Sequence, residues 1–257
     1  MAITRFAPSP TGYLHIGGLR TALYSYLWAR KTKGEFKLRI EDTDTARNND
    51  EAMRAIIEAF DWVGMSYDGE VEYQSKRGDI YTKYIKQLLE EGNAYKCYMS
   101  RDELDALRES QMANKQTPRY DGTWRPEDGK TLPAIPEGVE AVIRIKAPLE
   151  GEIKFVDAVK GDMKFAATEV DDFVIARSNG NPTYNFVVAI DDALMEMTDV
   201  IRGDDHLTNT PKQIVIYNHL GFETPNFCHV PMINNPSGKK LSKRDGAMDV
   251  MDYKRNG

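Results

Sequence analysis

Short apolar segments alternate with amphipathic ones over the first 75 residues. Residues 3–7 form an apolar run that ends in a proline-containing loop at 8–12, where regular strand pairing cannot continue. Apolar side chains recur at helical spacing over 17–31 and 50–62, and every second residue is apolar over 36–40. Strands that alternate with helices in this way predict a parallel α/β sheet.

The pattern changes in the middle of the chain. Ser75 is a candidate cap for a helix that runs to about residue 92, and Ser100 with Glu103 has the spacing of a capping box before a second helix. A stretch rich in proline and glycine follows at 117–138. Four short β segments come next, at 142–146, 153–157, 163–166 and 173–177, and a turn follows at 178–182. We therefore expect an α+β insertion over 81–182.

The α/β pattern then resumes. An apolar run at 187–190 leads into a short helix at 191–195, and a strand follows at 199–201. A helix is predicted over 211–219, with Thr208 or Asn209 as cap and Gly221 as stop, and a last strand is predicted over 227–233. We expect residues 1–80 and 183–245 to form the two halves of one Rossmann-like domain, and 246–257 to begin another domain.

Composition adds limits to this picture. Of the 257 residues, 41% are apolar and 29% charged, which is ordinary for a globular enzyme. The longest uninterrupted apolar run, Phe186 to Ile190, is far shorter than the roughly 18 residues of a membrane span. No secretory leader is visible at the N-terminus. The only two cysteines, Cys97 and Cys228, argue against a disulfide framework and favour the cytoplasm.

The net charge is −6, from 34 basic and 40 acidic residues. This balance argues weakly against nucleic-acid binding, although only the local charge of a binding face matters.

Two short motifs could carry phosphate chemistry. The segment His15-Ile16-Gly17-Gly18 opens a predicted helix, where free backbone N–H groups and the helix dipole suit a phosphate. By itself, the motif also fits a capped helix with a surface histidine. The second motif, Lys240-Leu241-Ser242-Lys243-Arg244, offers flexible cations to a polyphosphate, although for this cluster taken alone a solvated loop is the better explanation.

With these two motifs in this order, the chain resembles a class I aminoacyl-tRNA synthetase, and most closely the glutamyl-tRNA synthetases. Five further segments look like that family: 5–12, 39–44, 119–122, 198–203 and 231–233. The resemblance covers essentially the whole chain and implies a Rossmann-like sheet split by an insertion that binds the tRNA acceptor end.

The resemblance implies an ATP-dependent reaction in two steps. L-Glutamate and ATP form glutamyl-adenylate, and the acyl group then passes to tRNA(Glu). His15, Lys240, Lys243 and Arg244 are the implied catalytic residues, which act by positioning and charge stabilisation. The implied ATP contacts, besides Lys243, are Gly17, Gly18, Asp205, Met232 and Ile233, and Mg²⁺ arrives with ATP.

The implied glutamate pocket needs groups for both charged ends of the substrate. Arg5 and Arg202 are candidates for the side-chain carboxylate, because arginine binds carboxylates through two parallel hydrogen bonds. Glu41 is the candidate for the α-ammonium group, and Ala7, Ser9 and Tyr184 complete the walls. Such a site would reject glutamine, since its amide leaves a buried arginine without a charged partner.

The chain departs from the family in two respects. Family members are usually much longer, so we expect this chain to be an N-terminal catalytic fragment. Many also bind zinc in the insertion through Cys-x-Cys and two later ligands, whereas here Cys97 stands alone and Trp124 occupies a later ligand position. A single cysteine cannot hold a structural zinc, so none is predicted.

The resemblance also suggests partners and alternatives. The tRNA acceptor end is expected near Lys115, Arg119 and Arg125, although a solvated loop accounts for these residues equally well. Members of this family are usually monomers, so a monomer is expected. A short paralogue that attaches glutamate to a modified tRNA base, glutamyl-queuosine tRNA(Asp) synthetase, fits the length better but usually lacks an intact lysine motif. A non-catalytic tRNA-binding relative remains a third alternative.

Overall fold

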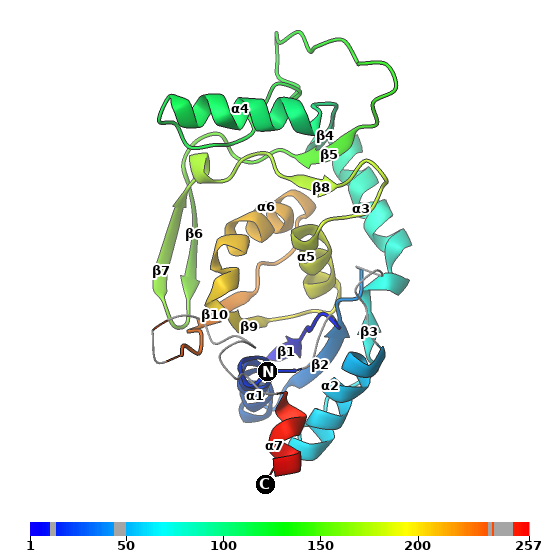
Figure 1. Ribbon diagram of the computed structural model, residues 1–257, viewed down its shortest axis with the longest axis vertical. Coiled ribbons are helices and arrows are strands. Elements are labelled where there is room, and N and C mark those ends of the chain that lie inside the picture. Colours follow the sequence, from blue (N-terminus) through cyan, green and yellow to red (C-terminus); the bar gives the residue numbers. More distant parts are fainter. Residues whose placement is uncertain (11–13, 44–49, 236–237, 239–248, 257) are drawn as a thin grey trace.

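A mainly parallel sheet in two separately paired parts forms the body of the molecule (Figure 1). The structure, a computed structural model, describes residues 1–10, 14–43, 50–235, 238 and 249–256. In one part of the sheet, three strands pair in parallel: β1 (Ile3–Phe6), β2 (Glu35–Ile40) and β3 (Glu72–Tyr73). In the other part, β10 (Asn226–Val230) lies between two parallel neighbours, β9 (Asp199–Gly203) and β6 (Glu152–Asp157). The backbone N–H of Thr198 donates to the carbonyl oxygen of Ile3 over 3.0 Å, so β9 begins beside β1. The predicted parallel α/β architecture is confirmed.

Helices cover both parts of this sheet. The helices of the N-terminal part are α1 (Ile16–Lys31) and α2 (Asp50–Val63), with α7 (Val250–Asn256) beside α2. Their apolar faces enclose a cluster around Phe36, Leu38 and Phe60. The helices of the second part are α3 (Gly78–Glu90), α5 (Tyr184–Leu194) and α6 (Thr210–Leu220). No helix in the described ranges has the length and apolar character that a membrane span needs.

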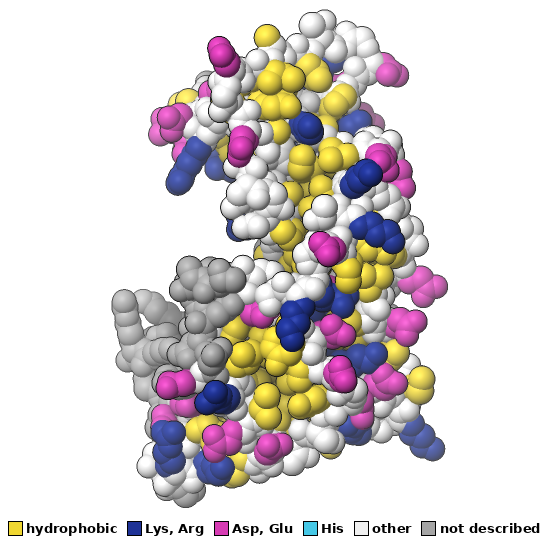
Figure 2. Space-filling model, turned by 90° about the vertical axis from the view of Figure 1, so that its right-hand side faces the viewer, with side chains coloured by type: hydrophobic (Ala, Val, Ile, Leu, Met, Phe, Trp, Pro, Cys, Tyr) yellow, Lys and Arg dark blue, Asp and Glu magenta, His cyan; other side chains and the backbone are white. Residues whose placement is uncertain are grey.

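The segment between α3 and α5 builds the upper part of the molecule. Three antiparallel strands, β4 (Ala94–Cys97), β5 (Val142–Ile145) and β8 (Val174–Ala176), form a small sheet next to α4 (Arg101–Ala113). In Figure 2, a hollow separates this part from the lower body. The predicted capping box of α4 is present, because Ser100 accepts from the Glu103 backbone while the Glu103 carboxylate accepts from Ser100.

One hairpin of this segment returns to the body. β6 and β7 (Gly161–Ala166) are antiparallel, and β6 pairs with β10 beside Phe227. Two strands of the range predicted as an insertion therefore belong to the sheet of the α/β body. The domain boundaries at residues 80, 182 and 245 stay a prediction.

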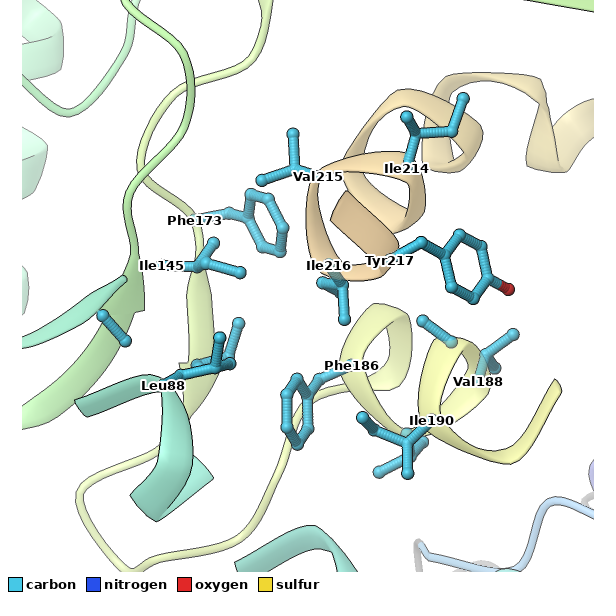
Figure 3. Packing of buried hydrophobic residues seen from close by; sticks show 14 of the residues in the cluster. Leu88, Ile145, Phe173, Phe186, Val188, Ile190, Ile214, Val215, Ile216 and Tyr217 are labelled. Carbon is cyan, nitrogen blue, oxygen red and sulfur yellow. The ribbon is translucent and has the colours of Figure 1, made fainter. Parts of the chain in front are cut away.

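Two local predictions were wrong. The short helix expected at 191–195 is the end of α5, which starts at Tyr184 and includes the apolar run. Every residue from Phe186 to Asp192 is buried, and Figure 3 shows Phe186, Val188 and Ile190 beside Ile216 and Tyr217 of α6. A helix enclosed in this way has no polar face, so its periodicity disappears. Ser75 does not cap α3, which begins at Gly78; instead, its hydroxyl donates to Asp42 over 2.6 Å.

Candidate active site

A cavity of about 320 Å³ lies where the carboxyl ends of β1, β2 and β9 meet the first turn of α1. β1 and β9 are neighbours here, and the strands are added outward from them, β2 beside β1 and β10 beside β9. Open parallel sheets bind their ligands at such a point. All twelve predicted site residues in the described ranges line the cavity: Arg5, Ala7, Ser9, His15, Gly17, Gly18, Glu41, Tyr184, Arg202, Asp205, Met232 and Ile233. Lys240, Lys243 and Arg244 lie outside the described residues.

The first turn of α1 explains the glycine pair. His15 is the N-cap, and its Nδ1 atom accepts from the backbone N–H of Gly18 over 3.2 Å. A Cβ atom on Gly17 would lie 3.1 Å from the His15 ring, and one on Gly18 would lie 2.8 Å from the Leu14 side chain. The small residues therefore let the imidazole fold back over the helix start.

The described residues on both sides of the lysine motif at 240–244, called here the lysine segment, lie at this cavity. Met232 and Ile233 line it on one side of the segment. On the other side, Asp249 forms an antiparallel bridge with His15, and the Val250 N–H donates to the Leu14 carbonyl over 2.8 Å. The two predicted phosphate-binding motifs are thus brought together at their flanks.

Arg5, which lines the cavity, and Arg39, which bonds to the cavity residue Glu41, share an acidic partner. Arg5 donates through Nε and Nη2 to both carboxylate oxygens of Asp192, over 2.9 and 3.1 Å. Arg39, which is fully buried, donates to Asp192 over 2.7 Å and to Glu41 over 3.2 Å. Burial alone would raise the pKa of Asp192, but Arg39 and Arg5 lower it to about 2. Asp192 is therefore a fixed anion that neutralises much of this pair.

Glu41 is the acidic wall of the cavity. It follows the end of β2 and is almost completely buried. Burial raises the pKa of its carboxyl group, and the neighbouring Arg39 and Arg5 only partly oppose this effect. A cation that enters the cavity beside Glu41 would favour its ionised form.

Arg202 differs from the other two arginines. It is 5% exposed, and no described carboxylate lies within ion-pair distance of it. Its Nε donates to Nε2 of His229 over 3.0 Å and its Nη2 donates to Oγ1 of Thr210 over 2.8 Å, whereas Nη1 has no hydrogen-bond partner. Burial, together with the nearby Arg5, lowers the pKa of Arg202. The cavity therefore contains a buried cation with one side unsatisfied.

Comparison with known proteins decides the family. The model of class I tRNA synthetases (E and Q), catalytic domain, matches residues 1–257. The chain belongs to this family.

Individual relatives agree with that family. Glutamate–tRNA ligase 1 of Aliarcobacter butzleri is 80% identical over the whole chain, and that of Wolinella succinogenes is 68% identical. The crystal structure of a glutamate tRNA ligase from Elizabethkingia meningosepticum in complex with its amino acid superposes with a TM-score of 0.84 at 39% identity; the match covers 95% of this chain and 52% of that one. The chain spans 55% of the Aliarcobacter ligase and 54% of the Wolinella ligase, about half of each curated relative. The resemblance inferred from the motifs is confirmed, and these matches favour the glutamate ligases over the queuosine-related paralogue.

In the upper part of this synthetase domain, aromatic side chains surround Cys97. The Cys97 thiol lies 3.6 Å from the Tyr120 hydroxyl, which accepts from the Trp124 backbone over 2.7 Å, and the Tyr98 and Trp124 rings are 5.0 Å apart. The described part of the chain contains no group of three or more His, Cys, Asp or Glu residues suited to a metal ion. Aromatic packing surrounds Cys97 at this position, and the absence of a structural zinc stays a prediction.

The three basic residues considered for the tRNA acceptor end have different surroundings. Arg119 and Arg125 line a second cavity of about 130 Å³. Arg125 is paired with Asp172 over 2.6 Å, and Arg119 donates to the Thr168 carbonyl over 3.2 Å. Lys115 is exposed and does not line this cavity.

Several groups around the site were not predicted from the sequence. His206 lines the cavity and contacts Tyr184, with its Nδ1 3.2 Å from the tyrosine hydroxyl. The signal available in the sequence was its position four residues after Arg202, between the predicted strand at 199–201 and the predicted helix at 211–219. Arg39 belongs to the segment 39–44 that resembles the family, but it was not singled out as a site residue. Asp192 and His229 carried no such signal, because each is a polar residue within a largely apolar helix or strand, and the sequence does not show its burial.

Proposed function

We propose that this chain contains the catalytic part of a glutamate–tRNA ligase, which joins L-glutamate to tRNA(Glu) through glutamyl-adenylate. The observation that carries the proposal is the unsatisfied Nη1 of Arg202 in a cavity that Glu41 also lines. A buried cation and a buried acid in one cavity suit a ligand with a carboxylate at one end and an ammonium group at the other. Glutamate has both.

In this proposal Arg202 binds the side-chain carboxylate through Nη1. Arg5 contributes its own Nη1, whose bond to the Ile201 carbonyl is long at 3.5 Å, while Asp192 holds the rest of its guanidinium. Glu41 binds the α-ammonium group, with Ser9, Ala7 and Tyr184 as the surrounding walls. Glutamine is rejected because its amide would leave the charge of Arg202 unneutralised.

Activation then takes place at the start of α1. The adenosine of MgATP contacts Gly17, Gly18, Asp205 and the strand end at Met232 and Ile233. The glutamate α-carboxylate attacks the α-phosphate, the bond to the β-phosphate breaks, and pyrophosphate leaves. His15 and the α1 N-terminus stabilise the phosphate charge, and Lys243, with Lys240 and Arg244, follows it onto pyrophosphate.

Transfer to tRNA, the role of Mg²⁺ and the state of the protein in the cell belong to the same proposal. The acyl group passes to the terminal adenosine of tRNA, whose acceptor end crosses the upper part of the molecule near Lys115, Arg119 and Arg125. Mg²⁺ enters bound to ATP, and no structural zinc is needed. The protein acts as a monomer in the cytoplasm.

Calorimetric titration with two non-reactive adenylate mimics tests the proposal, one glutamyl and one glutaminyl. We expect the glutamyl mimic to bind at least about 100-fold more tightly, as for a site that loses a hydrogen-bonded charge partner. Arg202→Met should abolish this preference, whereas Arg101→Met, at a position 92% exposed on α4, should leave it unchanged. Equal binding of both mimics to the unsubstituted protein would refute the proposed substrate.

A further inference from the structure

Three buried polar side chains, one of them Arg202, lie in a line across three neighbouring strands. Asp157 ends β6, His229 lies on β10, and Arg202 lies directly opposite His229 on β9. All three are buried, with exposed fractions of 2%, 0% and 5%. Only Arg202 lines the cavity; the other two lie behind it and have no role in the proposed chemistry.

The hydrogen bonds of this line fix the proton on His229. The Asp157 carboxylate accepts from the backbone N–H groups of Val159 and Lys160 over 3.0 and 2.9 Å, and it lies 2.6 Å from Nδ1 of His229. Because a carboxylate only accepts, Nδ1 must carry the hydrogen, which leaves the lone pair of Nε2 for Arg202. Nε of Arg202 donates to that lone pair over 3.0 Å.

The pKa values agree with this assignment. Burial, with the Arg202 charge beside it, lowers the pKa of His229 to about 4. Burial would raise the pKa of Asp157, but the Lys160 backbone N–H and His229 hold it below its ordinary value. At neutral pH the pair is a carboxylate and a neutral imidazole, joined by a hydrogen bond.

We infer that His229 and Asp157 are positioning residues for Arg202, which orient its guanidinium through a neutral acceptor and so leave its charge free for the substrate carboxylate. This inference rests on the proposed function. Thr210 completes the arrangement, because its Oγ1 accepts from Nη2 of Arg202 and lies 3.1 Å from Nε2 of His229. With Nε and Nη2 both held by neutral groups, Nη1 remains directed away from them.

The contrast with Arg5 shows why a neutral acceptor matters. Arg5 is oriented equally well, but by the carboxylate of Asp192, which also neutralises it. A carboxylate in the place of His229 would hold Arg202 in the same way and would remove the charge that separates glutamate from glutamine. Asp157 orients the imidazole, and the imidazole in turn orients the guanidinium of Arg202. The Asp157 carboxylate therefore stays one side chain further from Arg202.

Two substitutions at His229 separate hydrogen bonding from packing. In His229→Gln, the amide can donate to Asp157 and accept from Arg202; His229→Leu fills the space but does neither. We expect His229→Leu to weaken the glutamyl-adenylate mimic roughly 10- to 100-fold, as for a lost hydrogen bond to a charged group. The glutaminyl mimic should weaken less, so the preference between the two falls, while His229→Gln keeps that preference within about threefold.

The outcomes divide clearly. If both variants, or neither, lose the preference for the glutamyl mimic, the positioning role is wrong. If the unsubstituted protein shows no preference, the proposed function fails instead.

Should His229→Leu not fold, ¹⁵N NMR of the imidazole in the unsubstituted protein still tests the inference. We expect the neutral form with hydrogen on Nδ1 at pH 7, and either the Nε2–H form or the imidazolium overturns the inference.

Discussion

Replacing Arg202 by methionine is expected to stabilise the free protein and at the same time to remove its affinity for the glutamyl-adenylate mimic. Arg202 is a buried cation without a described carboxylate partner, and its Nη1 makes no hydrogen bond. A buried donor without a partner costs roughly 1–3 kcal/mol. Methionine has a similar length and removes both the orphaned donor and the charge.

The two hydrogen bonds that Arg202 makes do not leave new orphans when they are lost. Its acceptors, Thr210 Oγ1 and His229 Nε2, lie 3.1 Å apart and can bond to each other. The free energy of unfolding should therefore rise by about 1–3 kcal/mol, and the melting temperature by roughly 2–4 °C for each kcal/mol in a chain of this size.

Arg5→Met is the matched control. Arg5 lines the same cavity and is equally buried, but its Nε and Nη2 are both held by Asp192. Breaking a buried ion pair destabilises a protein by roughly 3–5 kcal/mol, so this variant should melt at a lower temperature than the unsubstituted protein.

Thermal unfolding at pH 7, with and without the glutamyl-adenylate mimic, measures both effects. The mimic should raise the melting temperature of the unsubstituted protein and leave that of Arg202→Met unchanged. If Arg202→Met were destabilised as strongly as Arg5→Met, the charge of Arg202 would have to be compensated in the free protein, and the reasoning from its unsatisfied side would be refuted.

Three further predictions concern pH and the upper part of the molecule. Burial raises the pKa of Glu41, so affinity for the substrate ammonium group should be full above that pKa and should be lost as pH falls through it. Calorimetry at several pH values should show this fall in affinity. Glu41→Gln should remove the pH dependence together with most of the affinity. His229 has a pKa of about 4 in the folded state against 6.5 when unperturbed, so the stability it contributes is complete above pH 6.5. As pH falls toward 4, roughly 3 kcal/mol of that stability should be lost. The free energy of unfolding of His229→Gln in urea should depend less on pH. Trp124→Ala should lower stability by roughly 3–5 kcal/mol, whereas a chelator should leave the melting temperature of the unsubstituted protein unchanged, and a clear fall with the chelator would contradict the prediction that no zinc is needed.

Much of the cavity wall was predictable because it consists of local segments with strong signals. His15 and its two glycines belong to a helix start, and Glu41 directly follows an alternating strand. Once a parallel sheet is expected, the carboxyl ends of its strands must meet at one edge, so residues that follow different strands come together. The two flanks of the lysine segment agree with this expectation.

Burial on both faces hid other features. Every second residue of β2 is apolar, a pattern typical of a strand with one polar face, but helices and loops cover both faces of a parallel sheet, and Arg39 is fully buried. The same enclosure removes the polar face of α5, so its apolar run carries no helical period. Similarly, the pairing of β6 with β10 depends on hydrogen bonds between segments about 70 residues apart, which local patterns do not encode.

The parallel α/β plan, the start of α1 and the set of residues that follow the strand ends can be predicted from the amino-acid sequence, because these features depend on spacing within short segments. What each arginine does depends on the folded arrangement. Arg5 and Arg202 are alike as candidates in the sequence, but Asp192 comes from a helix nearly 190 residues after Arg5 and neutralises it, while Arg202 meets the neutral His229. Charge neutralisation falls off with distance, so which cation stays unpaired depends on which side chains the fold brings within about 4 Å.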